Sequence, residues 1–314
     1  SCARLFLTWM GTQPDVIDKS VIYMQIYFCG MTGSMVYNFG ASILRAAGDI
    51  RSPLVFLSAA GVLNVALNLV FVMGFKMDVA GVALATAISQ AVSAVLVVLA
   101  LTRRDDMCRL FLKELKISPR HLAGMVRIGL PAGIQGAMFS ISNVLIQSSV
   151  NSFGSMAMSG NAAAGNIEGF VYMSMNAFQQ TATNFTGQNY GAKLYPRIRR
   201  ITLICLVCVA VVGAALGNLA YLFSEPLLKI YITDSAEAIR IGVLRMGFIS
   251  ALYFLDGVME VMTGVLRGMG RSAMPMAVTV LGVCVFRVVW IFTVFRVPEY
   301  HTLSTIYVSY PISW

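Results

Sequence analysis

The sequence predicts an all-α polytopic membrane protein whose helices form two pseudo-symmetric bundles. Three observations lead to this fold class. Of the 314 residues, 58% are hydrophobic and only 12% are charged, whereas a soluble domain carries roughly 25% charged residues. The apolar runs are about 20 residues or longer, as transmembrane helices require, and show none of the short alternating segments of barrel strands. Finally, a set of residues recurs at a spacing of 222 positions.

The duplication is clearest at a charged turn. The residues Leu, Arg, Gly and Pro at positions 44, 45, 48 and 53 recur at 266, 267, 270 and 275. The register continues upstream without a gap as far as Leu5 and Leu227. Chance identities are common among apolar residues, but a gapless register through a charged turn favours a real duplication. Repeats of this length are typical of transporters built from two related halves.

Residues 1–101 are assigned to the remainder of an N-terminal bundle. An apolar stub ends near Met10, and Pro14 opens the turn before a helix over 16–44. Further helices are predicted over 54–75 and from Asp78 to residue 101. The polar segment 102–127 is the longest and most charged connection, so we interpret it as a cytoplasmic linker between the halves.

Residues 128–314 are assigned to the C-terminal bundle. Apolar runs predict helices over 128–150, 161–185, 201–223, 241–266 and 273–295, with a last helix beginning near residue 303. Pro131 is placed in the first turn of its helix, where a missing N–H costs no hydrogen bond. The chain then has eight complete spans and two partial ones. Both ends look cut, so we expect a longer native protein.

The basic residues predict the topology. Fifteen of the 23 lysines and arginines lie in the loops that follow the first, third, fifth and seventh complete spans. By the positive-inside rule these loops are cytoplasmic, the segment 102–127 included. The net charge of +9 is therefore a topology signal and does not indicate a nucleic-acid partner. Arg267 is counted in this set of fifteen, and the alternate loops are predicted to hold only Lys19, Lys76, Lys229, Arg240, Arg245 and Arg296. Arg287 stands apart, because it lies inside a predicted span.

Two acids lie within the apolar run 241–266. Asp256 and Glu260 are four residues apart, so both carboxylates lie on one face of a helix. Inserting a carboxylate at the bilayer centre costs on the order of 3 kcal/mol of free energy on insertion scales, and such residues usually have a function. We therefore interpret the two acids as a proton or cation site facing a central cleft. The alternative is a structural pair with Arg287 or an amide.

Glu168 is a third acid in a predicted span. It begins a polar stripe whose spacing of three and four residues favours one helix face turned toward a cavity or the bundle interior. We assign Glu168 to the same proton or cation site as Asp256 and Glu260. We assign the rest of the stripe to a cleft that binds a substrate, with interhelical packing as the alternative for the amides. The stripe continues through Tyr172, Asn176, Gln179 and Thr183.

Other intramembrane polar residues carry weaker signals. Asn64 and Asn68 share a face, but amide hydrogen bonds between membrane helices contribute only about 0.6 to 2 kcal/mol, so a structural role competes with a substrate role. Asn38 occupies the position 222 residues before Glu260. The pair Cys205 and Cys208 has no second cysteine pair and no histidines nearby, so we predict no metal site there. We predict no cofactor other than the H⁺ or Na⁺ ion that the acids would bind.

Several stretches resemble the multidrug and toxic compound extrusion (MATE) family of cation-coupled transporters. They are PDVIDKSVIYMQIYFCG at 14–30, YNFGASILRAAGDIRSP at 37–53, VAGVALATAISQ at 79–90, IGLP at 128–131, FTGQNYGAK at 185–193 and VLRGMGRSAMP at 265–275. The resemblance implies twelve helices in two bundles of six. On that template the chain runs from the end of the third helix to the start of the twelfth, without the first helix and its coupling acid.

The resemblance also places individual residues. Asp256 falls on the tenth-helix position that often carries an aspartate in the family. The seventh helix lacks the acid found in some members, and Phe139 stands near that position. The coupling arrangement must therefore differ from that of members that use this pair of acids. Polar residues of this helix are Gln135, Ser140, Ser142, Asn143, Gln147 and Asn151, of which Gln147 and Asn151 are assigned to the substrate cleft together with Asn38, Asn64 and Arg287.

The resulting functional hypothesis is a secondary active exporter. It would exchange small amphipathic, often cationic, organic compounds for H⁺ or Na⁺, as a monomer in the plasma (inner) membrane. The rival within the broader superfamily is a flippase for lipids or lipid-linked oligosaccharides, which should line its cleft with more basic residues. An intramembrane enzyme is disfavoured because His121 and His301 belong to no catalytic cluster. A channel is disfavoured because no filter-like repeat is present.

Overall fold

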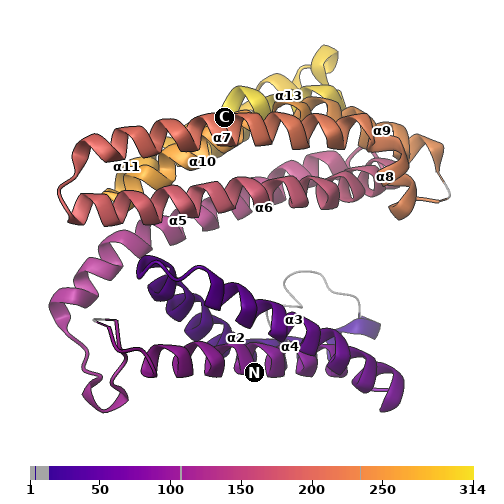
Figure 1. Ribbon diagram of the computed structural model, residues 1–314. Helices are drawn as coiled ribbons and strands as arrows, with labels where there is room; N and C mark the ends of the chain where they lie inside the picture. Colours follow the sequence, from indigo (N-terminus) through magenta and orange to yellow (C-terminus); the bar gives the residue numbers. More distant parts are fainter. Residues whose placement is uncertain (1–3, 5–13, 107, 234) are drawn as a thin grey trace. The chain divides into compact units, whose positions relative to one another are not determined.

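The structure is a computed structural model that describes residue 4 and residues 14–106, 108–233 and 235–314. All the regular elements in these residues are helices (Figure 1). The apolar stub predicted to end near Met10 lies outside the described residues. The chain divides into two compact units, residues 1–116 and 117–314. The boundary between them falls within the predicted linker 102–127.

The described residues of the first unit form three long helices. These are α2 (Pro14–Ala46), α3 (Arg51–Leu69), which a π-helical turn extends as η1 (Val70–Gly74), and α4 (Val79–Thr102). Helix α4 packs against both α2 and α3. Tyr37 and Leu44 of α2 meet Val97 and Leu101 of α4 in a small buried cluster. Between Thr102 and the second unit, the described residues form a short 3-10 turn, η2 (Leu112–Glu114).

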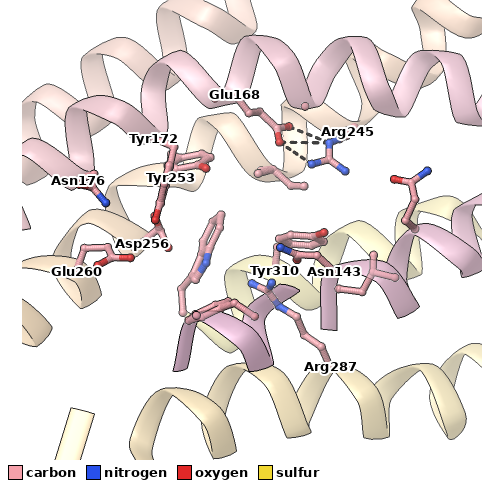
Figure 2. Close-up of a pocket in the computed structure, with 18 of the residues that line it drawn as sticks. Asn143, Glu168, Tyr172, Asn176, Arg245, Tyr253, Asp256, Glu260, Arg287 and Tyr310 are labelled. Carbon is pink, nitrogen blue, oxygen red and sulfur yellow. Dashed lines mark hydrogen bonds and ion pairs between the residues drawn. The ribbon is translucent and has the colours of Figure 1, made fainter. Parts of the chain in front are cut away.

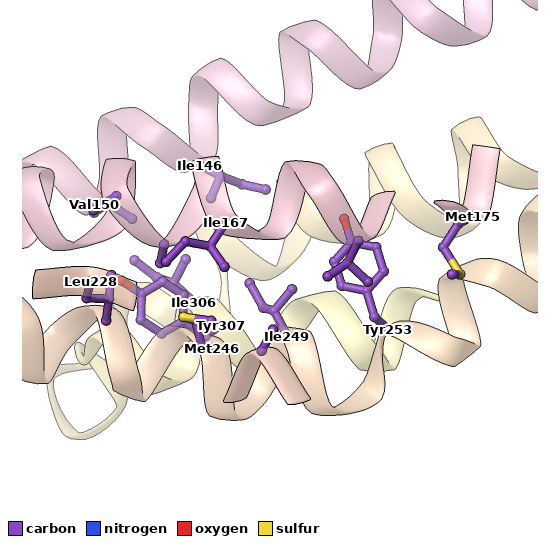
Figure 3. Close-up of a cluster of buried hydrophobic side chains, with 14 of the residues drawn as sticks. Ile146, Val150, Ile167, Met175, Leu228, Met246, Ile249, Tyr253, Ile306 and Tyr307 are labelled. Carbon is purple, nitrogen blue, oxygen red and sulfur yellow. The ribbon is translucent and has the colours of Figure 1, made fainter. Parts of the chain in front are cut away.

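The second unit is a bundle built around helix α6, which packs against α7, α9 and α10. Its buried apolar core includes Ile167, Met175, Met246 and Tyr307 (Figure 3). The helices are α5 (Pro119–Asn151), α6 (Ser155–Gly191), α7 (Tyr195–Leu222), α8 (Ser224–Tyr231), α9 (Ala236–Ile249), α10 (Tyr253–Gly268), α11 (Ala273–Thr279), α12 (Phe286–Phe292) and α13 (Leu303–Ser313). Short 3-10 and π-helical turns connect them as η3 (Ser250–Leu252), η4 (Val280–Val285), η5 (Val294–Arg296) and η6 (Pro298–Tyr300).

The helices have the dimensions of membrane spans. Six helical stretches of the described residues are long and apolar enough to cross a bilayer, namely Arg51–Gly74, Val79–Thr102, Pro119–Asn151, Tyr195–Leu222, Ala236–Gly268 and Ala273–Arg296. Helices α2 and α6 are also long, with 33 and 37 residues, but their charged and polar side chains keep them out of this set. The chain is therefore a multi-pass membrane protein.

The sequence repeat corresponds to a structural repeat. Helix α2 begins at Pro14 and ends at Ala46, and the helical stretch Ala236–Gly268 begins and ends 222 residues later. Both stretches end in the same cap, because Gly48 and Gly270 have φ values of 87° and 78°. In each cap the glycine N–H donates to the carbonyl three residues before it, and the next N–H donates to the carbonyl five residues before it. Glycine is favoured at this left-handed position.

The helices differ from the sequence-based prediction in several places. Helix α5 begins at Pro119 and not at 128, so Pro131 lies inside the helix and not in its first turn. Helix α6 continues to Gly191, beyond the predicted end at 185. The short helix α8 was not predicted, and the run 241–266 is interrupted by η3. Helix hydrogen bonds continue beyond an apolar run, so the length of the run does not set the helix ends.

Helices α6 and α10 approach each other closely at glycine positions. A Cβ atom built on Gly264 would lie 2.5 Å from the carbonyl oxygen of Gln179. Small residues let membrane helices pack backbone to backbone in this way. We therefore predict that Gly264→Ala forces α6 away from α10 and lowers stability by roughly 1–3 kcal/mol. Thermal unfolding of the purified protein in detergent measures this loss.

The matched control for this substitution is Gly282→Ala in η4, where an added Cβ meets no atom within 4 Å. This variant should unfold at or near the wild-type temperature. Equal unfolding temperatures for the two variants would contradict the close packing of α6 on α10.

Candidate functional site

A polar cavity of about 840 Å³ lies within the second unit. Its walls come from α5, α6, α9, α10, α12 and the end of α13. Three acids and three arginines line it, a concentration of charge that is unusual between membrane helices. The six charged residues are Glu168, Asp256, Glu260, Arg245, Arg267 and Arg287. In the described part of the chain, no group of three or more His, Cys, Asp or Glu residues could hold a metal ion.

A break in the helix positions the two acids of α10. The 3-10 turn η3 separates α9 from α10, so Asp256 lies in the first turn of a new helix. At this break, Gly217 of α7 lies so close that a Cβ atom on it would be 2.0 Å from the Ser250 carbonyl oxygen. Asp256 and Glu260 are 6% and 8% exposed and point into the cavity (Figure 2).

The two acids differ in their partners. Gln179 Nε2 of α6 donates a hydrogen bond to Glu260 Oε2. Asp256 Oδ2, in contrast, is buried without a hydrogen-bond partner. An unpaired buried acceptor carries the full cost of its lost hydration. Asp256 is therefore the acid of the cavity that keeps a buried acceptor atom without a donor.

Glu168 is held by an arginine that the sequence analysis placed in a loop. Arg245 Nη2 lies 2.6 Å from Glu168 Oε2, and Arg245 Nε lies 3.1 Å from Glu168 Oε1. Figure 2 shows this two-pronged ion pair between α6 and α9. Such fork-shaped pairs are among the strongest charge-assisted hydrogen bonds. The charge of Glu168 is thus already compensated within the protein.

Amides extend this ion pair into a network across three helices. Arg245 Nη1 donates to Asn161 Oδ1 at 2.6 Å, and Asn161 Nδ2 donates to Gln147 Oε1 at 2.7 Å. Gln147 Nε2 then donates to Asn151 Oδ1 at 2.8 Å. The network links α9, α6 and α5, so it fixes one wall of the cavity.

The other two arginines have different environments. Arg267, at the end of α10, donates from Nη2 to Gln135 Oε1 at 2.9 Å. Arg287 is only 2% exposed, and its guanidinium carbon lies 4.0 Å from the centroid of the Tyr310 ring. Arg287 Nε donates to Ser313 Oγ at 2.9 Å, while Nη2 is buried without a partner.

The structure brings together most of the predicted site residues. Eight of the eleven line the cavity: Asp256, Glu260, Glu168, Gln147, Tyr172, Asn176, Gln179 and Arg287. Asn151 is outside the lining but accepts the hydrogen bond from Gln147. Asn38 and Asn64 lie in the first unit, where Asn38 Nδ2 donates to the Ser34 carbonyl and Asn64 Nδ2 donates to Ser89 Oγ. Their assignment to a substrate cleft stays a prediction.

Two arginines of the cavity lie in helices and not in the predicted loops. Arg245 and Arg267 were counted with loop residues, but Arg245 is buried in α9 and Arg267 lines the cavity. A pattern in the sequence could have placed both arginines beside Asp256, because Arg245, Asp256 and Arg267 are spaced by 11 residues. Eleven residues correspond to about three helical turns, which puts all three on one face. The aromatic residues Tyr253, Tyr310 and Trp314 were also missed, since nothing distinguishes them from ordinary membrane residues.

The ion pair gives a stability prediction. Glu168→Gln leaves Arg245 buried without its countercharge, which typically costs about 3 kcal/mol or more. We therefore predict a clear fall in the thermal unfolding temperature. The double variant Glu168→Gln/Arg245→Gln should recover much of this loss, because neither charge remains.

The exposed ion pair between Lys229 and Glu225, with an N–O distance of 2.7 Å, provides the control. Glu225→Gln should barely change the unfolding temperature, because water solvates both partners. If Glu168→Gln unfolds like the wild type, the Glu168–Arg245 pair does not stabilise the bundle.

Comparison with known proteins identifies the family. The MatE family model matches residues 1–70 and 131–293. The chain is 25% identical over 315 residues to the probable multidrug resistance protein YoeA of Bacillus subtilis, covering 98% of this chain and 68% of the relative. It is 26% identical over 287 residues to the probable multidrug resistance protein YpnP of the same organism, covering 91% and 63%. The chain thus spans about two thirds of the length of these curated relatives.

Solved structures share the fold. The Vibrio cholerae MATE transporter VcmN in its bent form is 19% identical and has a TM-score of 0.86, with 99% of this chain and 70% of that chain covered. A MOP superfamily transporter from Pyrococcus furiosus is 18% identical with a TM-score of 0.92, at the same coverage. The predicted polytopic all-α fold of two related bundles is confirmed. Because the family model matches well over half of its residues, the chain belongs to the MatE family.

Proposed function

We propose that this protein exports small amphipathic organic compounds, many of them cationic, in exchange for H⁺ or Na⁺. The observation that carries the proposal is the pair of buried carboxylates, Asp256 and Glu260, on one face of α10 in a large cavity. The names of the relatives support it, because they include probable multidrug resistance proteins and multidrug export proteins. A cavity of about 840 Å³ also has the size expected for drug-sized ligands.

Coupling in this proposal is a competition at Asp256. A proton or Na⁺ that reaches the unpartnered carboxylate neutralises it, and a cationic compound then loses its countercharge. Because binding free energies are linked reciprocally, the bound compound weakens proton or Na⁺ binding by the same factor. Access of water from one side at a time, through movement of the two halves, turns this competition into export.

The three acids have distinct roles in this proposal. Asp256 exchanges the ion for the compound, and Glu260, with its hydrogen bond from Gln179, assists it. Glu168 contributes by fixing Arg245, because a carboxylate that already has an arginine partner gains little from a second cation. We therefore place the coupling step on α10 and a supporting role on Glu168.

The charge balance of the cavity favours export over the flippase alternative. The three arginines are matched by three acids. Arg245 is engaged by Glu168, and Arg267 donates to Gln135 but keeps Nε unpartnered. Arg287 keeps Nη2 unpartnered, so the cavity offers single free N–H groups and no cluster of free arginines. A cavity that holds a lipid pyrophosphate requires an excess of available basic groups, since phosphate recognition depends on them. The sequence predicts that Arg287 is the one arginine deep in a span, but Arg245 is also buried there.

The coupling role of α10 predicts a specific transport defect. Asp256→Asn mimics a permanently protonated site, so it should retain some ligand binding but lose gradient-driven export. Glu260→Gln should show a weaker form of the same defect. Export by the full-length protein in proteoliposomes, under a pH gradient and a Na⁺ gradient applied separately, measures both effects.

The control for these variants is Glu299→Gln, because Glu299 is exposed and outside the cavity. This variant should transport at the wild-type rate. If Asp256→Asn also exports at the wild-type rate under both gradients, α10 is not the coupling site.

The proposed orientation in the plasma membrane places residues 102–127 in the cytoplasm. Ile117 is 86% exposed, so Ile117→Cys in a cysteine-free background offers a reactive thiol in this segment. An impermeant maleimide should label it in inside-out vesicles and not in intact cells. Glu299→Cys, in a loop on the opposite side, should show the reverse pattern. Labelling of Ile117→Cys in intact cells would refute the orientation.

A further inference from the structure

The charged residues of the cavity are not equally satisfied. Glu168 and Arg245 pair with each other, and Glu260 accepts a hydrogen bond from Gln179. Among the charged cavity residues that are more than nine-tenths buried, two keep an atom without a partner, namely Asp256 at Oδ2 and Arg287 at Nη2. Buried polar atoms in native proteins are nearly always hydrogen-bonded, so each exception calls for an explanation.

The two unsatisfied atoms have opposite character. Asp256 Oδ2 is a hydrogen-bond acceptor with negative charge, and Arg287 Nη2 is a donor with positive charge. No ion pair joins these two residues in the described part of the chain, although both line the same cavity. A ligand that satisfies both atoms must carry a cationic or donor group and also an anionic group.

Arg287 is held in a way that leaves it ready to bind an anion. Its guanidinium stacks on the Tyr310 ring, with 4.0 Å between the guanidinium carbon and the ring centroid, and Nε is occupied by Ser313 Oγ. Both partners lie on α13 and immobilise the plane of the guanidinium group. Because arginine recognises carboxylates and phosphates through its planar set of N–H groups, such fixation pre-organises an anion site.

A row of aromatic rings connects the two residues. Tyr253 lies three positions before Asp256 on α10, and its ring centroid is 5.4 Å from that of Trp314. Trp314 lies 6.2 Å from Tyr310, which stacks on Arg287. Figure 2 shows Tyr253 near Asp256 and Tyr310 near Arg287. The wall between the two charged groups thus suits a flat, aromatic ligand body.

We propose that Asp256 and Arg287 form the two ends of one binding site for aromatic zwitterions. The cationic group of the compound pairs with Asp256, its carboxylate, sulfonate or phosphate pairs with Arg287, and its ring system lies along Tyr253, Trp314 and Tyr310. This inference rests on the proposed export of organic compounds and narrows its substrate class. Arg287 then acts as a residue that selects compounds with an anionic group.

A matched pair of ligands tests the site without any substitution. The probes are a xanthylium dye with a free benzoate and the methyl ester of the same dye, which keeps the cation but lacks the negative charge. Fluorescence anisotropy with the full-length protein in detergent gives the two dissociation constants. We expect the free carboxylate to bind about tenfold more tightly, as one charge-assisted hydrogen bond provides. Equal or tighter binding of the ester to the wild type would overturn the proposal.

Substitution of Arg287 tests whether this residue causes the preference for the dye with the free carboxylate. Arg287→Gln should bind both dyes equally, and Arg287→Lys should keep part of the preference. The control is Arg296→Gln, because Arg296 is exposed and contacts Phe292 outside the cavity. It should keep the full tenfold preference. An unchanged preference in Arg287→Gln would show that another group binds the carboxylate, and a variant that fails to fold leaves the decision to the wild-type comparison.

The binding assay uses no ion gradient, so it separates the two proposals. If the wild type binds both dyes equally but exports them under a gradient, the zwitterion site is refuted and the export function stands. If the wild type prefers the carboxylate dye but exports neither dye, the site stands and the export function is refuted.

Discussion

The structure depends on the cost of placing charge in an apolar medium. A charged side chain between membrane helices must find an opposite charge, a hydrogen-bonding partner or water, because the hydrocarbon offers none. In the second unit, six charged residues from α6, α9, α10 and α12 turn toward one cavity. The Glu168–Arg245 pair holds α6 to α9, and the Gln179–Glu260 bond holds α6 to α10. These requirements largely determine which faces of the helices point inward.

The same constraint explains why two similar halves carry different chemistry. The stretches Pro14–Ala46 and Ala236–Gly268 have the same length and end in the same glycine cap. The positions that hold Asp256 and Glu260 in the second stretch hold Ser34 and Asn38 in the first. Neutral side chains need no countercharge, so Asn38 is satisfied by the carbonyl of its own helix. The two stretches therefore share their length and their glycine cap, while Asp256 and Glu260 belong to the second stretch alone.

Helix breaks and close contacts give the cavity its shape. The 3-10 turn η3 interrupts the stretch that is continuous in α2, and it places Tyr253 and Asp256 in the first turn of α10. Gly217 allows α7 to lie directly against the Ser250 carbonyl, and Gly264 allows α10 to lie against α6. These glycines hold Asp256 and Glu260 in a fixed relation to Gln179 and to the aromatic residues of α13. A rigid arrangement of this kind is what a selective site requires.

The sequence by itself determined the membrane setting, the helical fold, the repeat and the acids of α10. Each of these depends on local composition or spacing along one helix, which a single sequence records directly. Tertiary structure decided which charges meet. Arg245 was counted as a loop residue because its place in the hydropathy pattern is ambiguous, yet it is buried against Glu168, 77 positions away. Likewise, only the packing of α12 and α13 shows that Arg287 stacks on Tyr310. Such pairings join residues on different helices, and nothing in the spacing along one helix specifies its partner on another.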